Sequence, residues 1–322
     1  MNYKFLVVGG AGFLGQHVVA ELLDRGHHAT VLARGTARPA SPVEVLTGDA
    51  LALGRAEWAG LLDGYDGVVF AAGADDRVVP RAPAAAFFRR GNVAPVAALM
   101  AAARDVGCTR AVVLGSYYTF VHRQRPGLRL ADRHPYVASR VEQAAAARQA
   151  AGDRLPVAVL EIPFVFGSVP GRRTLWAPLV PWLRSRYPLF APPGGTAAVP
   201  VRAVAQATAG ALETAAGDDY PLGEENLTWV ELVRRLAVAA GRPATTTVRR
   251  APAGLVHAGV HLTEAGYRLR GRQPGLRGTA LARLLTSELF VDPAVCREHL
   301  GVVPGGLDEA MRDTVTAGDR PG

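Results

Sequence analysis

A glycine-rich turn near the start of the chain is the feature that most limits the fold. Residues 3–8 form a short apolar run rich in residues that favour strands. Gly9, Gly12 and Gly15 follow at intervals of three, and apolar residues then recur at helical spacing from Phe13 to Leu23. This order predicts a strand, a tight turn and a helix whose N-terminus directs backbone N–H groups toward a pyrophosphate. An ordinary βα turn is the alternative, but a strand before the glycines and a helix after them are the context that dinucleotide binding requires.

The composition indicates a globular protein and argues against nucleic-acid binding. The chain has 322 residues, of which 49% are hydrophobic and 20% are charged, and this length suits two lobes that share a core. The formal net charge is +8, and every basic residue except Lys4 is an arginine. Because the arginines are spread along the chain in short groups such as Arg249-Arg250, we predict a solvated basic surface and no nucleic-acid partner.

The cysteines and apolar segments bear on location. Cys108 and Cys296 are isolated and lack metal-ligand spacing, which is typical of free thiols in a reducing cytoplasm. No stretch approaches the roughly 20 apolar residues that span a bilayer, and the first apolar run ends at once in the glycine turn. We therefore expect a cytoplasmic protein with no signal peptide and no membrane partner. The sequence leaves a homodimer open.

One group of residues has the spacing of a metal site. His257, His261 and Glu264 could share a helix face as ligands. The chain has no His-Glu-x-x-His pattern, so an ordinary surface helix is favoured and no metal is predicted.

Strand and helix signals alternate through the first half of the chain. After the first strand we expect strands at 29–33, 43–46, 67–71, 111–114 and 157–161, with helices at 13–25, about 56–62, 84–105 and 136–151. This alternation predicts an α/β fold, a Rossmann-type doubly wound parallel sheet covered on both faces. Ligands of such sheets bind at the carboxyl ends of the strands.

The pattern changes at Gly167, where proline and glycine become frequent. We expect residues 1–166 to form a dinucleotide-binding Rossmann domain, to which about 197–217 return. Residues 167–196 and 218–322 then form a smaller mixed lobe that binds the substrate. Within it, Thr228-x-x-Glu231 is a capping box that predicts a helix to about Ala240.

Residues after the second, third and fourth strands are expected to contact the cofactor. Arg34 follows the second strand, at the position that faces the adenosine ribose; an acid there would favour NAD, whereas an arginine can pair with a 2′-phosphate. NADP is therefore predicted, with NAD as the alternative. Asp49 could accept a hydrogen bond from the adenine amino group. The other expected contacts are Phe13 and Leu14 in the glycine turn, Ala50, and the small residues Ala71, Ala72 and Gly73.

Tyr136 and Arg140 are the candidates for proton transfer. They lie four residues apart at the start of a predicted helix and therefore share a face. A phenol with a pKa of about 10 exchanges protons poorly at neutral pH, and a nearby cation stabilises the phenolate and lowers that pKa. Ser116 and Tyr117 follow the fifth strand and place hydroxyls where a substrate carbonyl would lie. The alternative is that Tyr136 is a partly buried aromatic residue at the start of a helix, with its hydroxyl in water and no catalytic role.

The chain resembles the extended short-chain dehydrogenase/reductase superfamily, in particular its NAD-dependent epimerase/dehydratase branch. The resemblance covers nearly the whole chain and rests on Gly9-Gly10-Ala11-Gly12-Phe13-Leu14-Gly15, Asp49, Ala71-Ala72, Asn92-Val93, Ser116, Tyr136-x-x-Ser139-Arg140, Pro163-x-Val165-x-Gly167, Gly223-x-Glu225-Asn226 and Phe290-Val291-Asp292. It implies that Asn92, Pro163 and Val165 belong to the cofactor site and that the tyrosine is the general acid/base. The following cation would bind the nicotinamide ribose, and a serine or threonine would polarise the reacting carbonyl or alcohol.

Two departures from the family lie at the reacting end of the site. Arg140 stands where the family usually has lysine, and its planar fork does not reproduce a compact ammonium. Tyr117 stands where the catalytic serine or threonine often lies, so Ser116, Tyr117 and Thr119 are all candidates for the polarising hydroxyl.

Other departures concern the substrate. Members that act on nucleotide sugars usually carry Arg-x-x-Asn before the glycine that is Gly167 here, and this chain has Glu161 and Phe164 in those places. Residues 196–199 also lack the cation that would pair with a diphosphate. We therefore predict an NADP-dependent oxidoreductase acting on a carbonyl or secondary alcohol of a small, fairly apolar molecule. An NAD-dependent epimerase or dehydratase with transient oxidation, and a cofactor-binding protein without redox turnover, are the alternatives.

Overall fold

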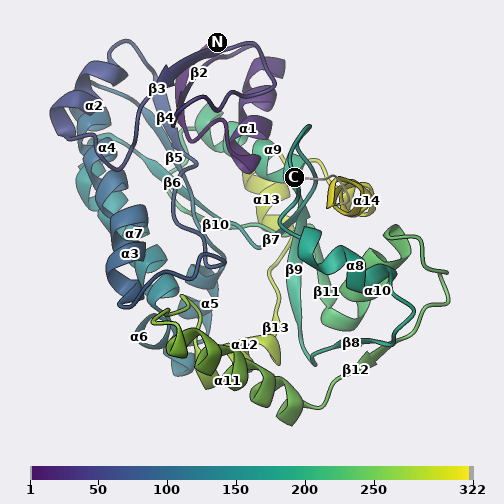
Figure 1. The fold of residues 1–322 in the computed structure, drawn as a ribbon. Helices are drawn as coiled ribbons and strands as arrows, with labels where there is room; N and C mark the ends of the chain where they lie inside the picture. Colours follow the sequence, from purple (N-terminus) through teal and green to yellow (C-terminus); the bar gives the residue numbers. More distant parts are fainter. Residues whose placement is uncertain (1, 319–322) are drawn as a thin grey trace.

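The computed structural model describes residues 2–318, which form two lobes (Figure 1). The larger lobe is built on a parallel seven-stranded sheet with the order β10-β6-β5-β4-β1-β2-β3. Its strands are β1 (Lys4–Val8), β2 (His28–Ala33), β3 (Glu44–Thr47), β4 (Gly67–Phe70), β5 (Arg110–Leu114), β6 (Val157–Glu161) and β10 (Asp219–Pro221). The chain leaves β1 toward β2 and later resumes at β4 on its other side, so the order reverses between β1 and β4, where such sheets bind ligands.

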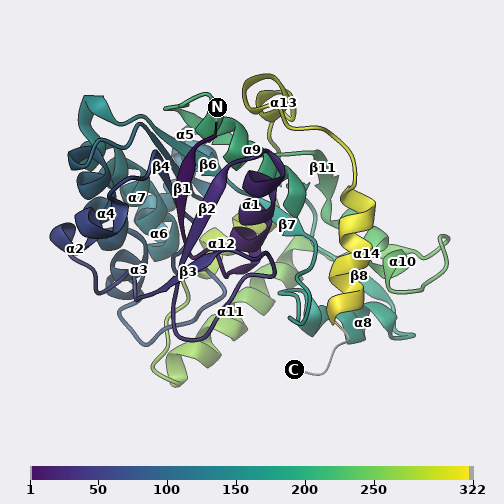
Figure 2. The same cartoon turned by 90° about the horizontal axis from the view of Figure 1, so that it is seen from above.

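Helices cover both faces of this sheet (Figure 2). Alternate residues of β1 serve the two faces: Phe5 and Val7 contribute to one buried cluster, and Leu6 and Val8 to the other. The first cluster includes apolar residues of α1 (Phe13–Asp24) and α9 (Val201–Glu213), and the second includes those of α2 (Arg55–Leu62), α4 (Ala94–Asp105) and α7 (Pro135–Ala151). Each fully buried side chain of this size contributes about 1.5–3 kcal/mol, so the two clusters stabilise the sheet from both faces.

The sequence prediction of a doubly wound parallel sheet is confirmed. One predicted helix, 84–105, is in fact two: α3 (Ala84–Asn92) and α4 meet at Val93. Pro95 lies in the first turn of α4, where its missing N–H costs nothing, whereas the interior of a continuous helix would lose a hydrogen bond there.

The smaller lobe contains short strands and helices. Strands β11 (Glu225–Thr228), β13 (Glu288–Leu289) and β7 (Phe164–Phe166) all pair with β9 (Gly195–Pro200), and β8 (Leu189–Ala191) pairs with β12 (Val248–Arg250). Its helices are α8 (Val180–Arg184), α10 (Trp229–Ala239), α11 (Ala253–Leu269), α12 (Gly278–Leu285) and α14 (Leu307–Gly318). Helix α13 (Ala294–Leu300) returns to pack on α9 and β10 of the larger lobe, and α5 (Tyr118–Gln124) and α6 (Leu130–Arg133) precede α7. Thr228 accepts a hydrogen bond from the Glu231 backbone at 3.2 Å, so the predicted cap of α10 is confirmed.

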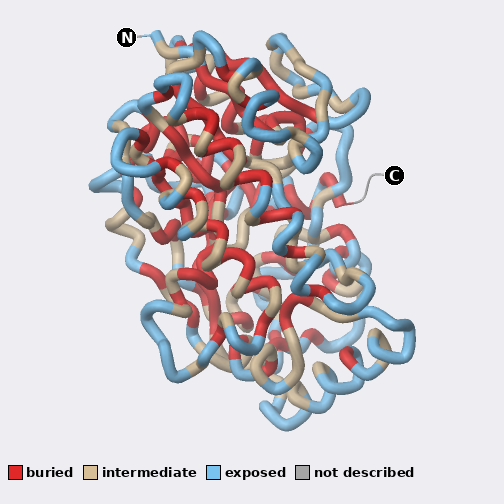
Figure 3. Tube along the Cα trace, turned by 90° about the vertical axis from the view of Figure 1, so that its left-hand side faces the viewer, coloured by how far each residue is buried: buried red, intermediate tan, exposed pale blue. Residues whose placement is uncertain are grey.

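The boundary between the lobes differs from the expected one. Residues 197–200, expected in the Rossmann domain, belong to β9 of the smaller sheet, and β10, expected in the substrate lobe, pairs with β6. The return to the large sheet therefore runs from Val201 to Pro221. The chain between residues 2 and 318 has no helix long and apolar enough to cross a bilayer. Buried chain runs through both lobes, with exposed chain around their rims (Figure 3).

Candidate active site

The glycine turn joins β1 to α1 in a shape that only glycine permits. Gly9 has a φ of +83°, and a side chain there would lie 2.9 Å from the backbone nitrogen of Ala72. A Cβ on Gly15 would lie 2.4 Å from the carbonyl oxygen of Gly9, so α1 could not approach the turn. Gly12 caps α1 without a side-chain hydrogen bond, which leaves first-turn N–H groups available to an anion. The turn therefore fits a cofactor that contains a pyrophosphate.

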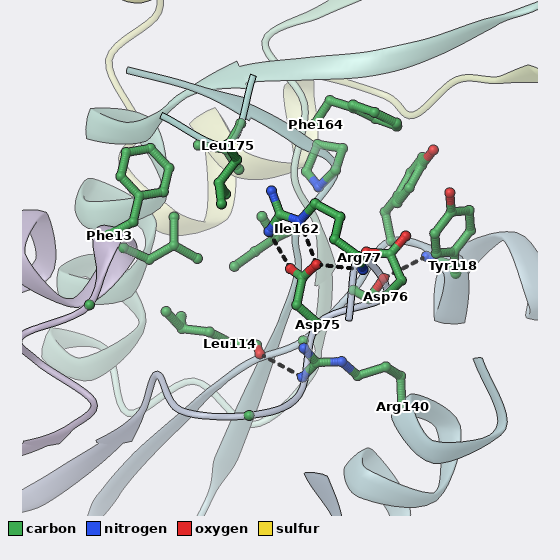
Figure 4. Close-up of a pocket in the computed structure, with 18 of the residues that line it drawn as sticks. Phe13, Asp75, Asp76, Arg77, Leu114, Tyr118, Arg140, Ile162, Phe164 and Leu175 are labelled. Carbon is green, nitrogen blue, oxygen red and sulfur yellow. Dashed lines mark hydrogen bonds and ion pairs between the residues drawn. The ribbon is translucent and has the colours of Figure 1, made fainter. Parts of the chain in front are cut away.

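A cavity of about 470 Å³ begins at this turn and follows the carboxyl ends of the parallel strands (Figure 4). This size suits a small-molecule site. Its walls combine the glycine turn, the loops after β4 and β5, the start of α7 and the segment around β7. They include Gly12, Phe13, Leu14, Ala71, Ala72, Gly73, Ser116, Tyr117, Tyr136, Arg140, Pro163, Phe164, Val165, Leu175 and Trp176.

Tyr136 and Arg140 lie together in the wall of the cavity, as their spacing predicts. The Arg140 Nε donates to the Tyr136 hydroxyl at 3.2 Å, and the Arg140 Nη1 donates to the Leu114 carbonyl at 3.3 Å and to Gln143 Oε1 at 2.8 Å. Burial raises the pKa of Tyr136, and Arg140 acts in the opposite direction. Arg140 thus lowers the pKa of Tyr136 as predicted, but the net pKa lies above its ordinary value because desolvation of the phenolate outweighs the arginine charge.

The three candidate hydroxyls after β5 take different directions. The Ser116 side chain lies near the Tyr136 hydroxyl and acts to lower the phenol pKa. The Tyr117 hydroxyl lies 3.1 Å from Thr196 Oγ1 on β9. Thr119 Oγ1 donates to the Ser116 carbonyl at 2.6 Å and also bonds Glu161. Ser116 is therefore the hydroxyl that the fold brings to Tyr136, whereas Tyr117 contributes its ring to the cavity wall.

Several predicted cofactor residues lie outside the cavity walls. Arg34 and Asp49 are exposed at the ends of β2 and β3, and Asp49 Oδ1 accepts from the Leu51 backbone at 3.1 Å. Ala50 packs against the core. Asn92 is fully buried: its Oδ1 accepts from the Ala74 backbone at 2.7 Å, and its amide donates to Ser139 Oγ at 3.0 Å. Asn92 thus joins the loop after β4 to α7.

Sequence reasoning missed a charged group in that same loop. Asp75, Asp76 and Arg77 line the cavity (Figure 4), and Arg77 pairs with Asp75. Burial acts to raise the pKa of Asp75, but Arg77 outweighs it and lowers the pKa. Burial and the Asp75 charge raise the pKa of Asp76 to about 7, against the opposing charges of Arg77 and Arg140. The only sequence signal was three consecutive charges, Asp75-Asp76-Arg77, in the loop after the buried strand β4.

Glu161 stands where family members that act on nucleotide sugars usually have an arginine. It is fully buried and does not line the cavity. Its carboxylate accepts from Arg123 Nη1 at 2.7 Å and Nη2 at 2.8 Å. Burial raises the pKa of Glu161 despite this arginine. Arg123 also lies 3.1 Å from Asp219, so the group joins α5, β6 and β10.

The smaller lobe holds the start of α7, the helix that carries Tyr136 and Arg140. The backbone N–H of Tyr136 donates to the Gly275 carbonyl at 3.2 Å, and the backbone N–H of Arg277 donates to His134 Nδ1 at 3.0 Å. A Cβ on Gly275 would lie 2.8 Å from the Cβ of Tyr136. Burial lowers the pKa of His134 to about 4, with Arg133 and Arg277 acting in the same direction, so the ring is a neutral acceptor at pH 7.

The candidate metal ligands serve other contacts. Glu264 pairs with Arg268 at 2.9 Å and with Arg277 at 3.4 Å, and His261 Nε2 lies 3.1 Å from Thr279 Oγ1. Within residues 2–318 no group of three or more histidine, cysteine or acidic residues could hold a metal ion.

Residues 5–186 match the model of the NAD dependent epimerase/dehydratase family, and the chain belongs to that family. No curated protein sequence matches the chain. Its fold is similar to that of gox2253, with a TM-score of 0.77, 21% identity and 98% of each chain covered. It is also similar to UDP-glucose-4-epimerase from Stenotrophomonas maltophila with bound NAD and formylated UDP-arabinopyranose (TM-score 0.69, 17% identity, 98% of each chain). Human epimerase family protein SDR39U1 (isoform 2) with NADPH gives a TM-score of 0.70 at 18% identity, covering 97% of this chain and 99% of the human one.

Proposed function

We propose that this NAD(P)-dependent family member is an NADP-dependent oxidoreductase acting on a carbonyl or secondary alcohol of a small, fairly apolar molecule. The observation that carries the proposal is the contact between Tyr136 and Arg140 in a cavity that begins at the glycine turn. A nicotinamide cofactor held along this cavity would supply or accept the hydride. Its pyrophosphate would be held by the turn at Gly12 and the start of α1.

The chain's own residues then handle the proton. Tyr136 gives a proton to the oxygen of a ketone, or removes it from an alcohol. Arg140 steadies the phenolate that results, because its Nε already contacts the hydroxyl. Ser116 lies near Tyr136 and would hydrogen-bond the same substrate oxygen. Phe164, Leu175 and Trp176 give the cavity an apolar lining beside this site.

The charges in the cavity support an uncharged substrate over a nucleotide sugar. The cations of its walls are Arg77, which pairs with Asp75, and Arg140, which contacts Tyr136. Asp75 would repel a diphosphate. The epimerase or dehydratase alternative is favoured by the family and by UDP-glucose-4-epimerase among similar folds, and it predicts NAD rather than NADP.

The first experiment identifies the cofactor. Purified protein is denatured, the released nucleotide is weighed by mass spectrometry, and NADPH and NADH are titrated by fluorescence. We expect NADP, and Arg34→Ser should weaken NADPH binding about tenfold or more while leaving NADH binding unchanged, because a charge-assisted hydrogen bond contributes about 1.5–3 kcal/mol. The exposed Arg154→Ser is the matched control. Release of NAD alone would favour the epimerase, and failure to bind NADPH would end the proposal.

A second experiment separates turnover from binding alone. NADPH oxidation is followed with a panel of small apolar ketones, using wild type and Tyr136→Phe. Loss of a general acid/base should lower kcat about 100-fold or more while NADPH affinity is kept. Unchanged function of Tyr136→Phe in cells would support a cofactor-binding protein without redox turnover. The buried thiols of Cys108 and Cys296 agree with the proposed cytoplasmic location.

A further inference from the structure

Helix α11 carries apolar side chains on a face that turns away from the protein. Leu255, Leu262 and Leu269 are 67%, 75% and 90% exposed. They are seven residues apart, so on a helix they lie within about 20° of their neighbours in the series. The residues nearest to them around the helix are small and uncharged: Ala258, Gly259, Ala265 and Gly266. We call the face formed by these seven residues the leucine stripe.

The opposite face of α11 packs against α12, mostly through half-buried side chains. Glu264 is the one buried residue of this 17-residue helix, and it is held by Arg268 and Arg277. The helix lies at the lower edge of the molecule beside α12 (Figure 1). A continuous exposed apolar face of this kind marks an interaction surface, and a helix with one buried residue gains little stability from tertiary packing.

The charge of the chain gathers around the same helix. Residues 241–283 contain eight arginines and one acidic residue, so they carry +7 of the net charge of +8. Arg249 and Arg250 precede α11, and Arg268, Arg270 and Arg272 stand at its end; all five are exposed. A helix of 17 residues is about 25 Å long, so cations lie at both ends of the leucine stripe.

We propose that α11 docks on an anionic lipid bilayer surface, with the leucine stripe among the headgroups and the flanking arginines on lipid phosphates. A helix with one apolar face and basic flanks gains from both contacts when it lies in the plane of the interface. Our expectation of no membrane partner rested on the lack of a spanning segment, and a helix lying on the surface needs none.

Charge and shape favour lipid over the other occupants. A second copy of the chain would bring two strongly positive segments together, which opposes association. A protein partner usually engages aromatic anchors in shaped pockets, whereas the leucine stripe offers leucines alone among alanines and glycines. A bilayer accepts such a face without shape complementarity and supplies the negative charge.

The test is co-sedimentation of the full chain with phosphatidylcholine vesicles, with and without phosphatidylglycerol, at low and high salt. Binding is expected only to the anionic vesicles and should weaken as salt rises. Leu262→Ser with Leu269→Ser should lower the partition coefficient about tenfold or more. Arg249→Gln with Arg250→Gln should lower it about 25-fold, at about fivefold for each arginine.

Matched variants elsewhere on the surface act as controls. Val303→Ser removes another exposed apolar side chain, and Arg154→Gln with Arg312→Gln makes the same change in net charge. Both should bind as wild type does, and circular dichroism melting verifies the fold of every variant. Absence of binding to anionic vesicles, or equal loss in the controls, overturns the proposal. If the protein forms a dimer without lipid and the leucine variants dissociate that dimer, the proposal is overturned, and a second copy of the chain covers the leucine stripe instead.

Discussion

Replacing Asp76 by asparagine tests whether the cavity holds a carboxyl in its protonated form. Burial, reinforced by the charge of Asp75, raises the pKa of Asp76 from 3.8 to about 7. The folded protein therefore binds this proton more tightly than the unfolded chain does. The resulting stability is complete below the unfolded pKa and is lost as the pH rises through about 7. Three pKa units correspond to about 4 kcal/mol.

The Asp76 side chain keeps part of its contact with solvent, which screens the charge, so we expect about 2 kcal/mol. An asparagine side chain cannot ionise, so the Asp76→Asn variant should match wild type below about pH 4, where the carboxyl is protonated in both states, but exceed it at about pH 9, where its melting temperature should be about 3 °C higher. Differential scanning fluorimetry at both pH values measures this. The exposed Asp63→Asn should show no such difference. An Asp76→Asn shift that is the same at both pH values would refute a protonated carboxyl.

Three further changes test the site and the fold. Gly15→Ala places a Cβ against the Gly9 carbonyl, so urea unfolding should show a loss of about 2 kcal/mol or more, and dinucleotide binding should weaken in parallel. Arg140→Ala removes the charge that lowers the pKa of Tyr136, so the alkaline limb of the pH–rate profile should move to higher pH, and Arg140→Lys should largely restore it. Thr228→Ala removes the cap of α10 and should cost about 1 kcal/mol in urea unfolding, with no effect on cofactor binding.

The larger sheet could be predicted because its strands carry strong local signals. Strands β1, β4 and β6 are short, mostly apolar runs, and their apolar residues are buried on both faces of the sheet. Strand β10 has three residues, one of them Pro221, and lies at the sheet edge, so nothing local distinguishes it from a loop. The break between α3 and α4 did have a local signal, the proline at 95. The sequence prediction gave more weight to the helical pattern that continues across it.

The candidate site was predictable only where a residue's role follows from its place in the sequence. Tyr136 and Arg140 share a helix face by spacing alone, and the structure places them in contact. The direction of the Tyr117 hydroxyl depends on Thr196, almost 80 residues later, which no local pattern could indicate. The place of Asp76 in the cavity was unpredictable for a similar reason. The fold brings the loop after β4 beside α7, and the spacing of these segments in the sequence does not indicate it.

The hydrogen bond from Tyr136 to Gly275 bears on how such proteins diversify. The match to the family model ends at residue 186, so the backbone that anchors the candidate catalytic tyrosine comes from beyond it. The smaller lobe is thus not a detachable module. A chimera that exchanged this lobe between relatives would need to carry a glycine at 275 in the same register, because a side chain there would collide with Tyr136 itself. Residues around this contact can vary and change the range of substrates, but the contact between Tyr136 and Gly275 must be kept.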